Sequence, residues 1–198
     1  MNVLDYSKTN PLAGGSSFSL KSRLVRMAWG VVWAVGASWT PRPLHPWRRF
    51  LLRLFGARMG HRADVRGSSR VWYPAHLDMA DGALIGPDCN CYNQAPIRLG
   101  RHALISQGVH LCSGTHDIDS ETFQLVARPI EIGDHAWIAA DAFIAPGTVV
   151  GEGAVVGGAA VAHGRLEPWT VYVGNPCRPL RARARAILHG HGDSEAGR

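Results

Sequence analysis

The sequence lacks several features that would place the protein in a familiar class. Its most apolar run, Met27 to Trp39, has 13 residues, whereas a membrane-spanning helix needs about 20, so this run does not cross a bilayer by itself. The four cysteines match no common zinc-binding spacing, and there is neither a recognisable secretory signal nor a DNA- or RNA-binding motif. We therefore expect a cytoplasmic protein with reduced thiols and no nucleic-acid partner.

Acidic residues are in the minority. The chain of 198 residues has a net charge of +6, and its arginines cluster near Pro43–Arg66 and Arg178–Arg185. Anionic partners suit such clusters. The length favours one main fold with a small appendage.

The first 60 residues, 1–60, are expected to form a helical segment. Residues 18–37 contain no proline and read as a helix, with Ser17 or Ser19 as a possible N-cap and with Trp29 and Trp33 on one face. A second helix is expected in HPWRRFLLRLFG, started by Pro46 and ended by Gly56.

The second helix is expected to be amphipathic. Its apolar face would comprise Trp47, Phe50, Leu51, Leu54 and Phe55, and its arginines would fall on the other side. Two interpretations stay open for both helices: they cap the protein core, or they attach to a membrane surface, namely the inner face of the inner membrane.

Beyond residue 60 the apolar residues recur every six positions, and a small residue follows most of them four positions later. An amphipathic helix cannot sustain this period, because its apolar face would precess. A period of six instead indicates a parallel β-helix, in which stacked coils bury one another's inner faces. We expect the glycine that often comes second in each hexapeptide to supply a turn with positive φ. The aliphatic positions are Leu99, Ile105, Leu111, Ile132, Ile138, Ile144, Val150 and Val156, with a rougher series upstream at Val65, Val71, Leu77, Ala83 and Cys89.

The run IGDHAWIAADAFIAPGTVVGEGAVVGGAAV, followed by WTVYVGNPCRPLRAR, resembles the hexapeptide-repeat acetyltransferases, in particular the colanic acid biosynthesis branch. The resemblance implies an all-β solenoid, a left-handed parallel β-helix over residues 61–176, with a short basic helical tail over residues 177–198. It also implies a homotrimer with active sites between subunits, acetyl-CoA as co-substrate, no metal, and a sugar or glycan acceptor.

The repeat breaks between Leu111 and Ile132, where 21 residues, three hexapeptides plus three, shift its phase. The break contains CSGTHD, and the resemblance makes His116 the general base that accepts the proton of the acceptor hydroxyl. Asp117, Asp119 or a backbone carbonyl would orient its ring. The resemblance also implies that a backbone N–H near Trp137, at Ala140 with Gly158 as a second candidate, faces the acetyl thioester.

The remaining site predictions also follow from the resemblance. Residues Tyr92, Asn93, Asp117 and Trp137 are expected to contact the acceptor. Asn93 would serve equally inside a turn, and Trp137 would equally stack on the pantetheine arm of acetyl-CoA or cover the outer face of a coil. The phosphates of acetyl-CoA are expected to meet Arg178 and Arg181. Many relatives have Thr-Lys where this chain has His163 and Gly164, and Arg165 would replace that lysine.

Two other classes of protein fit the same repeat. A γ-type carbonic anhydrase would need three histidines around zinc, including a closely spaced pair that this chain does not offer. A non-catalytic trimeric scaffold would keep the repeat without the chemistry, and the presence of His116 with the Arg178 pair argues against it.

Overall fold

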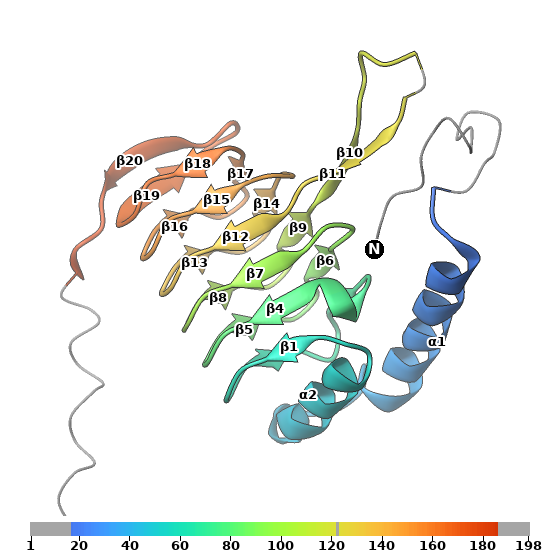
Figure 1. Ribbon diagram of the computed structural model, residues 1–198. Helices are drawn as coiled ribbons and strands as arrows, with labels where there is room; N and C mark the ends of the chain where they lie inside the picture. Colours follow the sequence, from blue (N-terminus) through green and yellow to red (C-terminus); the bar gives the residue numbers. More distant parts are fainter. Residues whose placement is uncertain (1–16, 122, 186–198) are drawn as a thin grey trace, which may run out of the picture.

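The computed structural model describes residues 17–121 and 123–185. The chain forms a three-sided solenoid of short parallel strands, with two helices at its N-terminal end and one hairpin that projects from its side (Figure 1). The helices are α1 (Leu20–Gly36) and α2 (His45–Leu54).

Each side of the solenoid is one sheet, and the chain passes through the three sides in turn. The first side comprises β1 (Arg58–Met59), β4 (Leu77–Met79), β7 (Ile97–Leu99), β12 (Ile130–Ile132), β15 (Val149–Val150) and β18 (Arg165–Leu166). The second comprises β2 (Asp64–Val65), β5 (Leu84–Ile85), β8 (Leu104–Ile105), β13 (Trp137–Ile138), β16 (Val155–Val156), β19 (Thr170–Val173) and β20 (Arg178–Ala182). The third comprises β3 (Arg70–Val71), β6 (Asn90–Tyr92), β9 (His110–Cys112), β14 (Phe143–Ile144) and β17 (Val161–Ala162).

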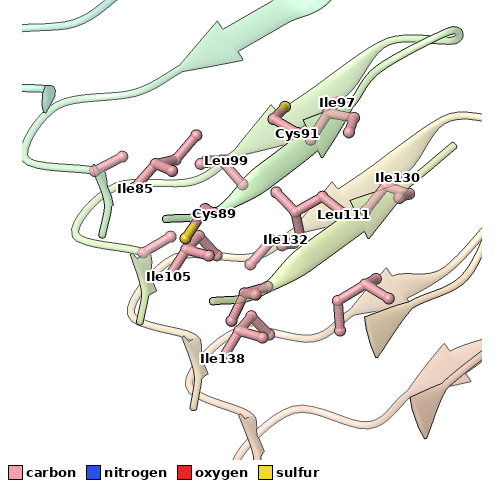
Figure 2. Close-up of a cluster of buried hydrophobic side chains, with 14 of the residues drawn as sticks. Ile85, Cys89, Cys91, Ile97, Leu99, Ile105, Leu111, Ile130, Ile132 and Ile138 are labelled. Atoms are coloured by element: carbon pink, nitrogen blue, oxygen red, sulfur yellow. The ribbon is translucent and has the colours of Figure 1, made fainter. Parts of the chain in front are cut away.

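The predicted six-residue repeat is confirmed. Its eight aliphatic side chains from Leu99 to Val156 are all buried inside the solenoid, and residues of successive coils lie in register, as in the pairing of Ile105 with Ile138 and of Ile138 with Val156. Figure 2 shows five of them, at Leu99, Ile105, Leu111, Ile132 and Ile138, pointing into one shared interior. The core is therefore a stack of aliphatic layers.

The upstream register was predicted wrongly after Val71. Val65 pairs with Ile85, and Val71 pairs with Cys91, so each step upward is 20 residues rather than 18. Two additional residues are accommodated in this coil, which contains a short 3₁₀ turn at Pro74–His76. Ala83 and Cys89 are buried, but they precede the strands.

The reason given for the glycines was also wrong. Gly133 and Gly151 do not have positive φ. Instead, a Cβ on Gly133 would lie 2.7 Å from the backbone nitrogen of Glu152, and one on Gly151 would lie 2.5 Å from that of Pro168. The positive φ falls two positions later, for example at His135 (57°). Glycine is required here because the next coil passes too close for a side chain.

Helix α1 agrees with its prediction. The Oγ of Ser19 accepts a hydrogen bond from the Ser22 N–H at 3.3 Å and caps the helix. The indole of Trp29 donates to the Val71 carbonyl at 2.7 Å, and that of Trp33 donates to the Ser69 carbonyl at 2.9 Å. These two buried rings attach α1 to the solenoid.

Helix α2 lies where predicted, but its buried face was predicted only in part, since Leu51 and Phe55 pack against the core. Arg48 is 1% exposed, whereas Trp47, Phe50 and Leu54 are 44–66% exposed. The Arg48 guanidinium lies 3.0 Å from an Asp64 carboxylate oxygen and also donates to backbone carbonyls. A buried arginine is tolerated because its charge and its N–H groups are satisfied in this way.

The basic tail was predicted to be helical, and its described part is a strand. Residues Arg178–Ala182 form β20, which pairs antiparallel with β19 at the end of the second side. The remaining predicted tail, residues 186–198, lies outside the described residues. The division of the chain at residues 60 and 176 stays a prediction.

Candidate active site

The break in the repeat forms a hairpin at the corner between the third and first sides. Strand β10 (Gly114–His116) pairs antiparallel with β11 (Leu125–Ala127), and His116 lies opposite Leu125. The hairpin extends away from the solenoid (Figure 1). The side chain of His116 is exposed at the outer end of β10.

The ring of His116 is held by Phe123. Its Nδ1 lies 2.8 Å from the Phe123 carbonyl oxygen, and the two rings stack with their centroids 4.5 Å apart. Phe123 has a φ of 46°, which non-glycine residues rarely adopt. Because a carbonyl can only accept, Nδ1 carries the proton, and the neutral ring presents the lone pair of Nε2.

The neighbouring carboxylate of Asp117 has a different partner. Its Oδ1 accepts a hydrogen bond from the Asp119 N–H at 3.2 Å, which shapes the tip of the loop. Of the three groups considered for orienting His116, the contact observed is to the backbone carbonyl of Phe123.

Residues at the end of β6 lie at the root of the hairpin. The Tyr92 hydroxyl accepts a hydrogen bond from Gln94 Nε2 at 2.6 Å, and its ring meets that of Trp72 edge-on. Burial raises the pKa of Tyr92, so the phenol stays protonated near neutral pH and can donate. Asn93 is fully buried and bonds to both backbone groups of Tyr73. It therefore fills the turn role and does not face an acceptor.

Sequence reasoning did not single out Gln94. Its side chain is buried, and its Oε1 has no hydrogen-bond partner among the described residues. A Cβ on Gly114 would overlap that oxygen, which explains glycine at the start of β10. Nothing in the sequence NCYNQAP distinguishes Gln94 from its neighbours.

Ala140 and Gly158 occupy equivalent places in successive coils, at the corner between the second and third sides. A Cβ on Gly158 would lie 3.4 Å from the Ala140 carbonyl oxygen. Within the described residues the N–H of Ala140 has no acceptor. Trp137 precedes this corner on β13, half-exposed, and its indole donates to Ser106 Oγ at 2.9 Å.

His116 and Ala140 lie at opposite ends of the third side of one chain. Their corners are separated by a strand with its flanking residues, about six residues, or roughly 20 Å at the rise of an extended chain. A base must come within hydrogen-bond reach of the reacting hydroxyl. Within a single chain, His116 therefore does not reach a thioester that is bound at Ala140.

The predicted phosphate contacts fall into two groups. Among the described residues, the guanidiniums of Arg178 and Arg181, both exposed on β20, each donate to a nearby backbone carbonyl, of Cys177 and Ala182 respectively. His163 and Arg165 lie at the other corner, the one from which the His116 hairpin projects two coils earlier. The two groups approach each other at Cys177, the residue before Arg178, whose N–H donates to the Val161 carbonyl at 2.8 Å and whose thiol contacts the His163 backbone.

Within the described ranges, no three or more His, Cys, Asp or Glu side chains are grouped so that they could hold a metal ion. In the described part of the chain, the rings of His102 and His135 stack with their centroids 5.4 Å apart.

No family model matches the chain, but individual proteins do. It is 42% identical over 155 residues to WcaF of Escherichia coli strain K12, which is named for colanic acid biosynthesis acetyltransferase activity, and the match covers 78% of this chain and 85% of WcaF. The chain belongs to the hexapeptide-repeat acetyltransferase family. The predicted family is thereby confirmed.

Solved structures agree with this family. A hexapeptide-repeat acetyltransferase of Vibrio cholerae in complex with acetyl coenzyme A gives a TM-score of 0.77 at 22% identity, covering 86% of this chain and 93% of that one. A maltose O-acetyltransferase of Clostridium difficile gives 0.76 at 23%, covering 84% and 90%. A galactoside acetyltransferase in complex with coenzyme A gives 0.74 at 19%, covering 98% and 100%. The predicted left-handed β-helix is confirmed as the fold of this acetyltransferase.

Proposed function

We propose that the protein transfers the acetyl group of acetyl-CoA to a hydroxyl of a sugar in exopolysaccharide or glycolipid biosynthesis, in the cytoplasm, with His116 as general base. The family membership supports acetyl transfer, and the names of the relatives support a glycan acceptor. The observation that carries the proposal is the hydrogen bond between His116 Nδ1 and the Phe123 carbonyl, since it presents Nε2 as a proton acceptor.

In the proposed reaction Nε2 removes the proton of the acceptor hydroxyl while its oxygen attacks the thioester carbonyl carbon. The tetrahedral intermediate then collapses with cleavage of the C–S bond. The sulfur leaves with the proton that His116 holds, giving the O-acetylated sugar and free CoA. A positioned base of this kind contributes about 10²- to 10⁴-fold to the rate.

The oxyanion of the intermediate would be bound by the N–H of Ala140, with Gly158 beside the acetyl-CoA backbone. Because His116 and Ala140 lie on different corners, we propose that they act together across a subunit interface of a homotrimer. Cyclic assemblies place one copy of a surface against a different surface of its neighbour. Light scattering that gave only a monomer at micromolar concentration would contradict this.

The remaining residues are assigned by their position relative to these corners. Tyr92 and Asp117, near His116, and Trp137, near Ala140, would contact the acceptor. Asn93 is left out because its amide is already bonded inside the turn. The pairs Arg178 with Arg181 and His163 with Arg165 would bind the phosphates of acetyl-CoA, with Arg165 in place of the lysine of relatives.

The test compares two substitutions of His116. His116→Ala removes the base and should lower kcat by about 10²- to 10⁴-fold. His116→Asn can still donate to the Phe123 carbonyl from its amide but cannot accept a proton, so it should lose as much. The control variants are His102→Asn and His135→Asn, and asparagine tolerates the positive φ of both positions. If the His116→Asn enzyme keeps its activity, His116 is a structural residue and not the general base.

A further inference from the structure

The solvent-facing side of α1 is an unbroken apolar stripe. Five side chains spaced four, three, four and four residues apart share one face of the helix, and each is 50–72% exposed. The stripe extends over nearly the whole 17-residue helix, from Leu20 to Val35, or about 22 Å at 1.5 Å per residue. Its members are Leu20, Leu24, Met27, Val31 and Val35.

The stripe continues where the two helices meet. The Trp39 indole N–H donates to the Val35 carbonyl and that of Trp47 donates to the Gly36 carbonyl at 2.7 Å. Both rings are exposed, and Phe50 stacks on Trp47 with centroids 5.6 Å apart. Because each indole N–H already has a partner, the rings present only apolar surface. We call the α1 stripe with these three aromatic residues the N-terminal apolar face.

Charge near this face has one sign. Residues 17–63 contain nine Lys and Arg and no Asp or Glu, whereas the remainder of the chain contains twelve basic and fifteen acidic residues. Lys21 and Arg23 are exposed on α1, one on each flank of the stripe by helical geometry. The positive charge of the whole chain therefore comes from the segment that carries the N-terminal apolar face.

From these observations we propose that the N-terminal apolar face docks on the surface of an anionic lipid bilayer. Helices that lie in a membrane interface combine Trp, Phe and Leu on one face with flanking Lys and Arg. Each such cation adds about fivefold in affinity for anionic lipid. No helix within the described residues is long and apolar enough to span a bilayer, so the contact is peripheral, with α1 lying along the surface.

Trp29 and Trp33 fix the orientation, since they hold the opposite side of α1 against the solenoid through bonds to Val71 and Ser69. The amphipathic helix is therefore already folded and aimed before it meets a membrane. Its docking does not require the transferase reaction.

The test is co-sedimentation of the full chain with vesicles of equal parts phosphatidylglycerol and phosphatidylcholine, and with vesicles of phosphatidylcholine alone. We expect strong binding to the first, weaker binding to the second, and a loss as salt is raised. The double variant Leu24→Gln, Val31→Gln should bind at least about tenfold more weakly. The double variant Lys21→Gln, Arg23→Gln should lose about 25-fold, on the fivefold figure for each cation.

Leu104→Gln is the matched control, because Leu104 is 38% exposed on β8, away from the N-terminal apolar face, and should bind vesicles as the parent does. Light scattering on the same variants tests the competing occupant, a second copy of this chain. The proposal is overturned if the parent protein binds neither kind of vesicle. It is also overturned if the Leu24→Gln, Val31→Gln variant binds them with the same affinity as the parent. The proposal also fails if the Leu24→Gln, Val31→Gln variant dissociates into monomers while the parent binds no vesicles, because the face would then be a contact between copies of this chain.

Discussion

The assignment of the Ala140 N–H as the oxyanion donor can be tested by Ala140→Pro, because proline has no backbone N–H. Ala140 is the first central residue of a turn whose second central residue, Asp141, has a φ of 59°. The Ala142 N–H closes this turn on the Ala139 carbonyl at 3.4 Å. This is the pattern of a type II turn, in which proline is common at the first central position.

The chain already has proline at the equivalent position of other turns. Proline occupies the same place in three other corners, each time before a residue with φ between 54° and 78°: Pro87 before Asp88, Pro146 before Gly147, and Pro168 before Trp169. The proline ring is therefore expected to fit at position 140. The free energy of unfolding should change by less than about 1 kcal/mol.

The catalytic effect should be much larger. Loss of one oxyanion donor costs about 10²- to 10³-fold in kcat, or about 2.7–4 kcal/mol of transition-state stabilisation. The donor is engaged only when negative charge develops on the oxygen, so the KM for acetyl-CoA should change little. The measurement is the rate of CoA thiol release with a sugar acceptor.

Gln107→Pro is the matched control, because Gln107 holds the same place in the preceding coil and is followed by Gly108 with a φ of 69°. A wild-type kcat in Ala140→Pro, or an equal loss in Gln107→Pro, would refute the assignment.

A mixture of the two inactive variants tests whether the site is shared. When equal amounts of Ala140→Pro and His116→Ala chains are refolded together, a site between subunits has both groups intact in about one quarter of cases, so about one quarter of the wild-type rate should return. No activity should return if each site lies within one chain.

Two further predictions concern binding and stability. Replacing Arg178 and Arg181 by Ala should weaken acetyl-CoA binding by about tenfold or more with little change in kcat, since charged hydrogen bonds are lost; unchanged affinity for both CoA and dephospho-CoA would remove the tail from the phosphate site. Arg48→Met should lower the free energy of unfolding, measured in urea, by about 3–5 kcal/mol, because the buried Asp64 carboxylate loses one of its two cationic partners. A loss below about 1 kcal/mol would show that Arg66, 2.9 Å from the same carboxylate, is enough to neutralise it.

Sequence reasoning was most successful where the physics is local and repeated. Leu99, Ile105 and Leu111 recur at the spacing of a three-sided coil, and each coil can bury its inner face only against the next. The break before Ile132 could be located for the same reason, as a change of phase. The family resemblance then placed His116 in that break.

Reasoning of this kind failed where partners come from distant parts of the chain. Arg48 reads as a solvent residue because only the fold places Asp64 beside it. The glycine at position 133 reads as a turn residue until the backbone of Glu152 is found above it. Likewise, nothing in the order of residues shows that Phe123 would hold the ring of His116.

The sequence by itself thus determined the solenoid, its interior layers from Leu99 onward and the position of the inserted loop, since coils with a fixed period of aliphatic residues bury them by stacking. Only the tertiary structure decided which nitrogen of His116 is free and that His116 and Ala140 lie on different corners. It also decided that α1 turns Trp29 inward and Val31 outward. These outcomes depend on contacts between residues far apart in the chain, whose geometry no local pattern encodes.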